Sequence, residues 1–201
     1  MKKPIINQIN TVNRHTSTQS SNFRCVYIIR HGECKSNVTW PIENYSDAMD
    51  VLTPLGRKQA LASADFLNLI LNSWQRNILD AKMYSSTLKR AKETSDIIHA
   101  RLGFTTPIIH DHRLIEHGGE NEGPRKFRNR VSAVFNDLVN TDHDCIVVCH
   151  GHTMQAILAL CLNTRHDKID ASVNNGGICI FNGRSLIHWN LIPQNTNSFG
   201  L

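Results

Sequence analysis

The sequence predicts an α/β fold in which helices cover both faces of a mostly parallel sheet, and three observations support this. Two short runs, residues 25–29 and 145–149, are entirely apolar, as is typical of strands buried inside a parallel sheet. Segments with helical spacing of apolar residues alternate with strand-like runs along the chain. The length of 201 residues suits one domain with a sizeable core. We therefore expect a three-layer α/β/α sandwich.

The individual elements follow from apolar spacing and from residues that begin or end them. Thr53 can cap a helix that begins at Pro54, and Gly103 can end a later helix. A Ser or Thr of residues 85–87 is expected to cap that later helix, and the turn at residues 182–184 predicts a closing hairpin. In order, we expect strand 25–29, loop 35–51, a helix from 54 to about 71, strand 78–84, a helix to 102, strand 107–109, helix 125–140, strand 145–149, helix 153–162 and strands 178–181 and 185–189.

Composition and charge exclude several classes of protein. The formal net charge of +5 suits an anionic substrate, but no dense Lys/Arg stripe with interleaved aromatic residues indicates nucleic-acid binding. No apolar run approaches the length of a membrane span. The six cysteines form no C-x-x-C pair, and in a chain this long they are expected to be free thiols in a reducing compartment, the cytoplasm.

The two ends of the chain are polar. We expect a disordered tail over residues 1–22, one domain over 23–192 and a second polar tail over 193–201. No acidic residue precedes Glu33, so a basic, Ser/Thr-rich organelle transit peptide is the alternative interpretation of the first segment.

Two histidines stand where buried strands end. His31 and His150 each follow an apolar strand and are each followed by glycine. Arg30 precedes the first of them, and Arg90 lies in the first turn of a helix that also follows a strand. Ligands of open α/β sheets bind at the carboxyl ends of strands, and helix amino termini favour anions. Two arginines, two histidines and a helix dipole together predict a phosphate pocket.

These positions resemble the histidine phosphatase superfamily, also called the phosphoglycerate mutase-like family. Five matching blocks occur in family order from about Arg24 to Trp189. They are Arg30-His31-Gly32-Glu33-x-x-x-Asn37, Leu52-Thr53-Pro54-Leu55-Gly56-x-x-Gln59-Ala60, Ser85-Ser86-x-Leu88-x-Arg90-Ala91-x-Glu93-Thr94, Leu114-x-Glu116 and Val147-Val148-Cys149-His150-Gly151. The resemblance implies a phosphoglycerate mutase-like fold and a phosphatase that needs no metal or other cofactor.

The resemblance also implies a role for each matching residue. His31 is the expected nucleophile and forms a phosphohistidine, while Glu116 acts as general acid and then as general base, and His150 assists catalysis. The phosphoryl oxygens are expected to be bound by Arg30, Asn37, Arg90, His150 and Gly151. Chemistry supports these roles, because two neighbouring arginines disfavour protonation of an imidazole and so keep it nucleophilic.

Two departures from the family pattern stand out. Cys34 occupies a position where the family usually has Thr or Ser, and two nearby cations predict either a thiol of lowered pKa or an inert small side chain. Few residues separate Glu116 from the strand at 145–149, so the usual capping insertion is expected to be small or absent. Glu120 and Glu122 therefore remain alternatives for the acid.

Other functions compete with a phosphatase. A phosphoglycerate mutase-type phosphotransferase is disfavoured, because the run His117-Gly118-Gly119 replaces the family's Arg-His-Tyr-Gly. A metallohydrolase is suggested by the spacings His110-x-His112 and His150-x-His152. A binding module without activity is a third class. The expected substrate is a phosphorylated small molecule or a phosphoprotein, with Arg125 to Arg130 available for extra phosphates, and neither nucleic acid nor a membrane is an expected partner.

Overall fold

The structure is a computed structural model, and it describes residues 24–118 and 122–193. The first predicted tail and almost all of the second lie outside these ranges. Among the described helices, none combines the length and apolar character that crossing a bilayer requires. All six cysteines are described, and all are free thiols.

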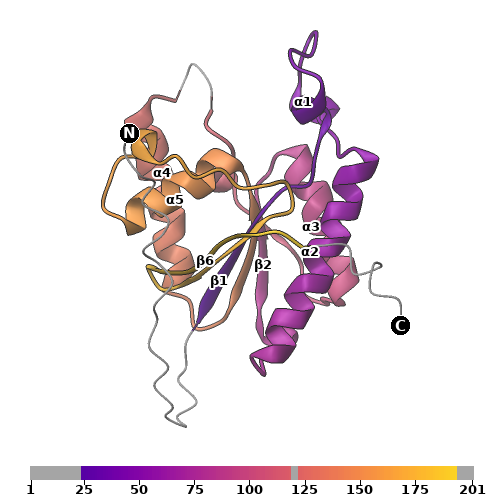
Figure 1. The fold of residues 1–201 in the computed structure, drawn as a ribbon, viewed down its shortest axis with the longest axis vertical. Helices are drawn as coiled ribbons and strands as arrows, with labels where there is room; N and C mark the ends of the chain where they lie inside the picture. The colour runs from indigo at the N-terminus through magenta and orange to yellow at the C-terminus, as the bar shows by residue number, and fades with distance from the viewer. Residues whose placement is uncertain (1–23, 119–121, 194–201) are drawn as a thin grey trace, which may run out of the picture.

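A six-stranded sheet of order β3-β2-β4-β1-β5-β6 forms the middle of the molecule (Figure 1). The first four strands of that order are mutually parallel, β5 runs antiparallel to β1, and β6 runs antiparallel to β5. The prediction of a mostly parallel sheet is confirmed. The strands are β1 (Cys25–Arg30), β2 (Lys82–Ser85), β3 (Ile109–His110), β4 (Cys145–Cys149), β5 (Ile178–Asn182) and β6 (Ser185–Leu191).

Helices cover both faces of the sheet, as predicted (Figure 1). Tyr27 and Ile29 of β1 pack on the side of α2 (Pro54–Ser73) and α3 (Lys89–Leu102). Val26 and Ile28 point the other way, toward the core formed with α4 (Pro124–Val139) and α5 (Gly151–Cys161). Because successive strand side chains alternate between faces, an entirely apolar β1 is what a sheet with two cores requires.

The start of α2 is fixed against the loop that follows β1. Thr53 caps the helix by accepting a hydrogen bond from the Gly56 nitrogen at 3.0 Å, as predicted, and its hydroxyl also donates to the Glu33 carboxylate at 2.7 Å. A Cβ atom added to Gly32 would lie 2.3 Å from the Gly56 oxygen. Both residues must be glycine for the backbones to approach this closely.

Several predicted boundaries are wrong. The segment Ile78–Asp80 is a 3-10 turn closed by local bonds, and β2 begins only at Lys82. Leu88, not a Ser or Thr, is the N-cap of α3, and it has no side-chain cap. The strand expected at 107–109 is Ile109–His110, and α5 begins at Gly151, two residues earlier than expected.

Candidate active site

The two histidines that follow β1 and β4 meet at one edge of the sheet. Arg30 and Cys149 are register partners, so the two strands end side by side. The ring centroids of His31 and His150 are 5.1 Å apart. Both side chains are buried. The predicted convergence of the strand ends is therefore present in the structure.

The hydrogen bonds of His31 determine which ring nitrogen is nucleophilic. Nδ1 lies 2.8 Å from the Gly32 carbonyl, which can only accept, so Nδ1 carries the proton. Nε2 accepts from Nε of Arg90 at 3.3 Å and therefore bears the lone pair. Burial, followed by the positive charge of Arg90, lowers the pKa of His31 to about 3. The imidazole is thus neutral at physiological pH, with Nε2 available for attack.

Arg90 is held in place by a buried carboxylate. Its Nη1 donates to Oδ2 of Asp50 at 3.1 Å, and Asp47 lies 3.7 Å away. Asp50 is fully buried and also accepts from the Ser36 amide at 2.9 Å and the Ser36 hydroxyl at 2.8 Å. Burial alone would raise the pKa of Asp50, but these hydrogen bonds and Arg90 hold that pKa below its usual value. Asp50 therefore positions the Arg90 guanidinium with its Nε toward His31.

Two buried side-chain nitrogens beside the histidines have no hydrogen-bond partner within the described part of the chain. They are Nε of Arg30 and Nδ1 of His150. Arg30 is anchored by its Nη1 to the Val173 carbonyl at 2.6 Å, and Nε2 of His150 lies 2.8 Å from the Ser86 hydroxyl. A buried polar group without a partner costs free energy. An anion bound at the strand ends can accept from Nε of Arg30, and also from Nδ1 of His150 in the tautomer whose Nε2 accepts from the Ser86 hydroxyl.

Glu116 lies at the amino terminus of α5, close to the histidine pair. Its Oε1 accepts from the His152 backbone nitrogen at 3.1 Å and is 3.4 Å from the His152 ring. Burial alone would raise the pKa of the Glu116 carboxyl. The hydrogen bond and the charge of His152 outweigh burial, so the pKa of Glu116 lies below its usual value. The hydrogen bond to Glu116 in turn raises the pKa of His152. In this state Glu116 is a carboxylate.

One arginine of α4 fixes the segment that carries Glu116. Arg130 donates to the Glu116 carbonyl at 3.3 Å and to the Ile115 carbonyl at 3.0 Å. The same guanidinium binds both oxygens of Glu122, whose carboxylate also accepts from the Gly118 nitrogen. Glu122 is therefore engaged in holding the loop. Glu120 lies outside the described residues, so of the three candidate acids the structure places Glu116 beside the histidines.

The structure gives Asn37 and Gly151 positions at the edge of this cluster. The Asn37 side-chain oxygen accepts from the Cys34 nitrogen at 3.2 Å and from Asn175 at 3.0 Å. Asn175 also donates to the His31 carbonyl at 3.0 Å, so this network supports the loop that carries His31. Gly151 starts α5 directly against Arg30.

Of the two interpretations of Cys34, the thiol of lowered pKa is wrong. The thiol is fully buried, and burial raises its pKa despite the cation at Arg90. Its Sγ lies within 3.3 Å of Ser36 and of Asn37. The alternative interpretation, a small buried side chain, agrees with these contacts.

The histidines with metal-like spacing do not form a cluster. His110 lies on β3 and His112 in the 3-10 turn His112–Leu114, whereas His150 and His152 stand at the start of α5. In the part of the chain that the structure describes, no three His, Cys, Asp or Glu side chains are grouped so that they could hold a metal ion.

Sequence reasoning missed three residues that contact the predicted ones. Asp50 is the acidic residue next to the apolar pair Val51-Leu52, a weak signal for burial. Ser86 is one of the three residues expected to supply a helix cap, but its hydroxyl faces His150. The spacing of His152 from His150 suggests only a metal ligand, whereas in the structure His152 pairs with Glu116.

Comparison with solved structures places this geometry in a known fold. A mycobacterial glucosyl-3-phosphoglycerate phosphatase in complex with VO3 is similar, with a TM-score of 0.63 and 20% identity, over 83% of this chain and 99% of that one. A phosphoserine phosphatase from Entamoeba histolytica in complex with 3-phosphoglyceric acid is similar, with a TM-score of 0.64 and 19% identity, over 84% of this chain and 97% of that one. No curated protein sequence matches the chain.

The sequence model of the Histidine phosphatase superfamily (branch 1) matches residues 26–125 and 117–185, which together span most of the chain. These ranges include both strand-end histidines, both arginines and Glu116. The chain therefore belongs to branch 1 of the histidine phosphatase superfamily.

Proposed function

We propose that the protein hydrolyses phosphomonoesters without a metal, through a phosphohistidine formed on His31. The observation that carries this proposal is the protonation state of that ring. Nδ1 donates to the Gly32 carbonyl, and the pKa is lowered to about 3, so Nε2 keeps its lone pair at neutral pH. A neutral imidazole fixed in one tautomer is a nucleophile that needs no further activation.

The surrounding donors suit a transferring phosphoryl group. We expect Nε of Arg90 to exchange its hydrogen bond from Nε2 of His31 to a phosphoryl oxygen when the substrate binds. Nε of Arg30 then finds an acceptor, and so does Nδ1 of His150 when the Ser86 hydroxyl donates to Nε2. Phosphoryl transfer depends mainly on positioning and on neutralising the charge of the equatorial oxygens, which these three side chains can do.

Glu116 is the proposed acid and base. In the first step Nε2 of His31 attacks phosphorus, the bond to the leaving oxygen breaks, and the Glu116 carboxyl gives that oxygen a proton. Glu116 is a carboxylate before substrate binds, and the negative charge of the phosphate raises its pKa and favours uptake of the proton. In the second step the Glu116 carboxylate takes a proton from water, which attacks phosphorus and releases inorganic phosphate from His31.

The proposed substrate is a phosphorylated small molecule or a phosphoprotein. The similar solved structures include phosphatases named for small phosphorylated molecules, which agrees with the first class. The free thiols agree with a reducing compartment such as the cytoplasm.

A substrate panel tests this function. Phosphorylated sugars, inositols, nucleotides and phosphopeptides are incubated with wild type, with and without a chelator, and release of inorganic phosphate is measured. We expect activity that survives the chelator and is lost in His31→Ala. His188→Ala, on an exposed position of edge strand β6, is the matched control and should keep full activity. Loss of activity with the chelator, or a fully active His31→Ala, contradicts the proposal.

A further inference from the structure

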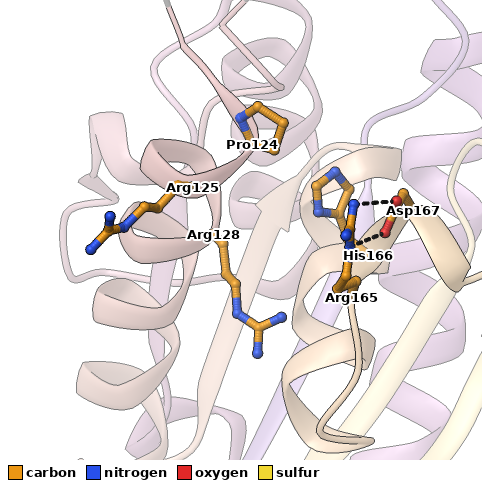
Figure 2. Close-up of a pocket in the computed structure, with 6 residues that line it drawn as sticks. All are labelled: Pro124, Arg125, Arg128, Arg165, His166 and Asp167. Atoms are coloured by element: carbon orange, nitrogen blue, oxygen red, sulfur yellow. Dashed lines mark hydrogen bonds and ion pairs between the residues drawn. The ribbon is translucent and has the colours of Figure 1, made fainter.

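A cavity of about 250 Å³ lies between the start of α4 and the chain that follows α5, apart from the strand-end histidines. Figure 2 shows its lining, in which Arg165 pairs with Asp167 and Arg125 turns away from that pair. The lining includes neither of the two histidines and neither of the two arginines that would bind the phosphoryl group. Binding of that group therefore depends on the polar atoms at the strand ends.

The strand ends hold two of the four buried side-chain atoms that have no hydrogen-bond partner within the described ranges. These two are Nε of Arg30 and Nδ1 of His150. The first is a donor in every state of the protein. The second can donate to a phosphoryl oxygen only if Nδ1, rather than Nε2, carries the ring proton. The contacts on the other side of the His150 ring decide between these two tautomers.

His150 is a neutral imidazole in the folded protein. Its side chain is fully buried, and burial is the largest cause that lowers its pKa well below the usual value of 6.5. The neighbouring groups His31, Arg90 and Arg30 lower that pKa further. A neutral imidazole carries one proton, so the ring of His150 presents one donor and one acceptor.

The Ser86 hydroxyl contacts Nε2 of this ring from the neighbouring strand end. Ser86 follows β2 and His150 follows β4, and the Ser86 amide donates to the Val148 carbonyl at 2.9 Å. The hydroxyl oxygen lies 2.8 Å from Nε2 of His150. It also lies 3.3 Å from the Leu88 nitrogen, a backbone group that can only donate. The hydroxyl therefore accepts from Leu88 and keeps its own hydrogen for another acceptor.

The two tautomers of His150 differ in how many buried polar groups they satisfy. Among the described residues, Nε2 of His150 is the acceptor that the Ser86 hydrogen can reach. If Nε2 carried the proton, that hydrogen would have no acceptor, and Nδ1 would present a lone pair to a bound phosphate. If Nδ1 carries the proton, the hydroxyl donates to Nε2, and Nδ1 lacks a partner only until an anion binds. The second arrangement is the favoured one.

We propose that Ser86 is a positioning residue, which holds His150 in the tautomer protonated on Nδ1 so that this N–H donates to the transferring phosphoryl group. The proposal rests on the proposed phosphatase function and deepens it. His31 presents the lone pair of Nε2 to phosphorus, whereas His150 presents an N–H to an oxygen. Because a hydroxyl is neutral, Ser86 selects the tautomer without adding a negative charge that would repel the substrate.

The tautomer can be measured without any assay of activity. ¹⁵N NMR of protein labelled in its histidines distinguishes protonated from unprotonated ring nitrogens, and His150→Gln identifies the His150 signals. We expect wild type to be protonated on Nδ1 of His150, both free and with bound vanadate, and free Ser86→Ala to contain the form protonated on Nε2. Wild type protonated on Nε2, or an unchanged tautomer in Ser86→Ala, overturns the proposal. The wild-type spectrum suffices for this decision if Ser86→Ala folds poorly.

Kinetics measure the consequence for the reaction. Ser86→Ala should lower kcat/KM and raise the Ki of vanadate, each by about tenfold, because one ordinary hydrogen bond no longer favours the required tautomer. Ser95→Ala is the matched control. Ser95 is also fully buried, and its hydroxyl donates to the Lys92 carbonyl within α3, away from the histidines. This variant should keep the activity and the vanadate affinity of wild type.

A double-mutant cycle separates a role through His150 from a general effect on the fold. In a His150→Ala background, Ser86→Ala should cost no further activity. A further tenfold loss there, or an equal loss in Ser95→Ala, overturns the proposal while the phosphatase function stands. If wild type neither hydrolyses phosphomonoesters nor binds vanadate, the proposed function itself fails, and the NMR spectrum still decides the tautomer.

Discussion

Replacing Arg90 by alanine should remove activity and stability for two separate reasons. The change deletes the donor that lies 3.3 Å from Nε2 of His31, so the phosphoryl group loses one of its stabilising contacts. Removing one donor of this kind typically slows catalysis by about 10²–10³-fold. The change also leaves Asp50, which is fully buried, without its cation. Breaking a buried ion pair costs about 3–5 kcal/mol, and we expect the lower end because the Ser36 donors remain.

A second substitution separates the two effects. Asn in place of Asp50 removes the buried charge while keeping a side chain that can accept from Ser36. Arg90→Ala/Asp50→Asn should therefore recover most of the lost stability, but the rate should stay about 10²–10³-fold below wild type, because the donor to the phosphoryl group is still missing.

The assay combines urea unfolding with steady-state kinetics on an aryl phosphate. Arg57→Ala is the control, since Arg57 pairs with Glu93 at 3.2 Å but is 53% exposed. That variant should lose less than about 1 kcal/mol and keep its rate. Recovery of the rate together with stability in the double variant would show that Arg90 acts only through the fold, and would refute the reasoning.

Three further predictions concern single residues. Glu116→Gln should severely slow release of the leaving group from alkyl phosphates, yet leave that step nearly unchanged for an activated aryl phosphate, whose leaving group needs no proton. Single-turnover rates that fall equally for the alkyl and the aryl phosphate would show that Glu116 is not the acid. Because folding lowers the pKa of His31 from 6.5 to about 3, the unfolded chain binds a proton that the native chain does not between those values. As pH falls through that window, His31 alone should lower the free energy of unfolding by about 1.4 kcal/mol per pH unit. We expect urea unfolding of His31→Gln at a series of pH values to show a dependence of unfolding free energy on pH that is shallower by this amount. Cys34 should resist alkylation at neutral pH in the folded protein and react in urea, and rapid labelling of the native thiol would contradict its raised pKa.

The fold could be predicted because its signals are local and repeated. The runs at residues 25–29 and 145–149 are apolar without a break, and the structure buries every residue of both. Helix α4 shows the same agreement, with Phe127, Val131, Val134, Phe135 and Leu138 buried at helical spacing. The meeting of His31 and His150 then follows from topology, since parallel neighbouring strands end at one edge.

The supporting contacts could not be predicted because they depend on how irregular segments fold back. Asp50 reaches Arg90 only through the course of the loop after β1, which has no periodic pattern. The pairing of Glu116 with His152 joins two segments whose relative position is set by Arg130. At Ile78–Asp80, apolar residues favour a strand, but local backbone bonds form a 3-10 turn instead.

The central claim is that Nε2 of His31 carries the phosphoryl group, and direct trapping tests it. In Glu116→Gln the aryl phosphate should still phosphorylate the enzyme, while the missing base slows attack by water, so the intermediate accumulates. Mixing this variant with a labelled aryl phosphate and mapping the modified peptide at alkaline pH should place phosphate on His31, as the Nε2-linked isomer and labile to acid. Phosphate on Nδ1, phosphate that survives strong acid, or label on a residue other than His31 would contradict the account.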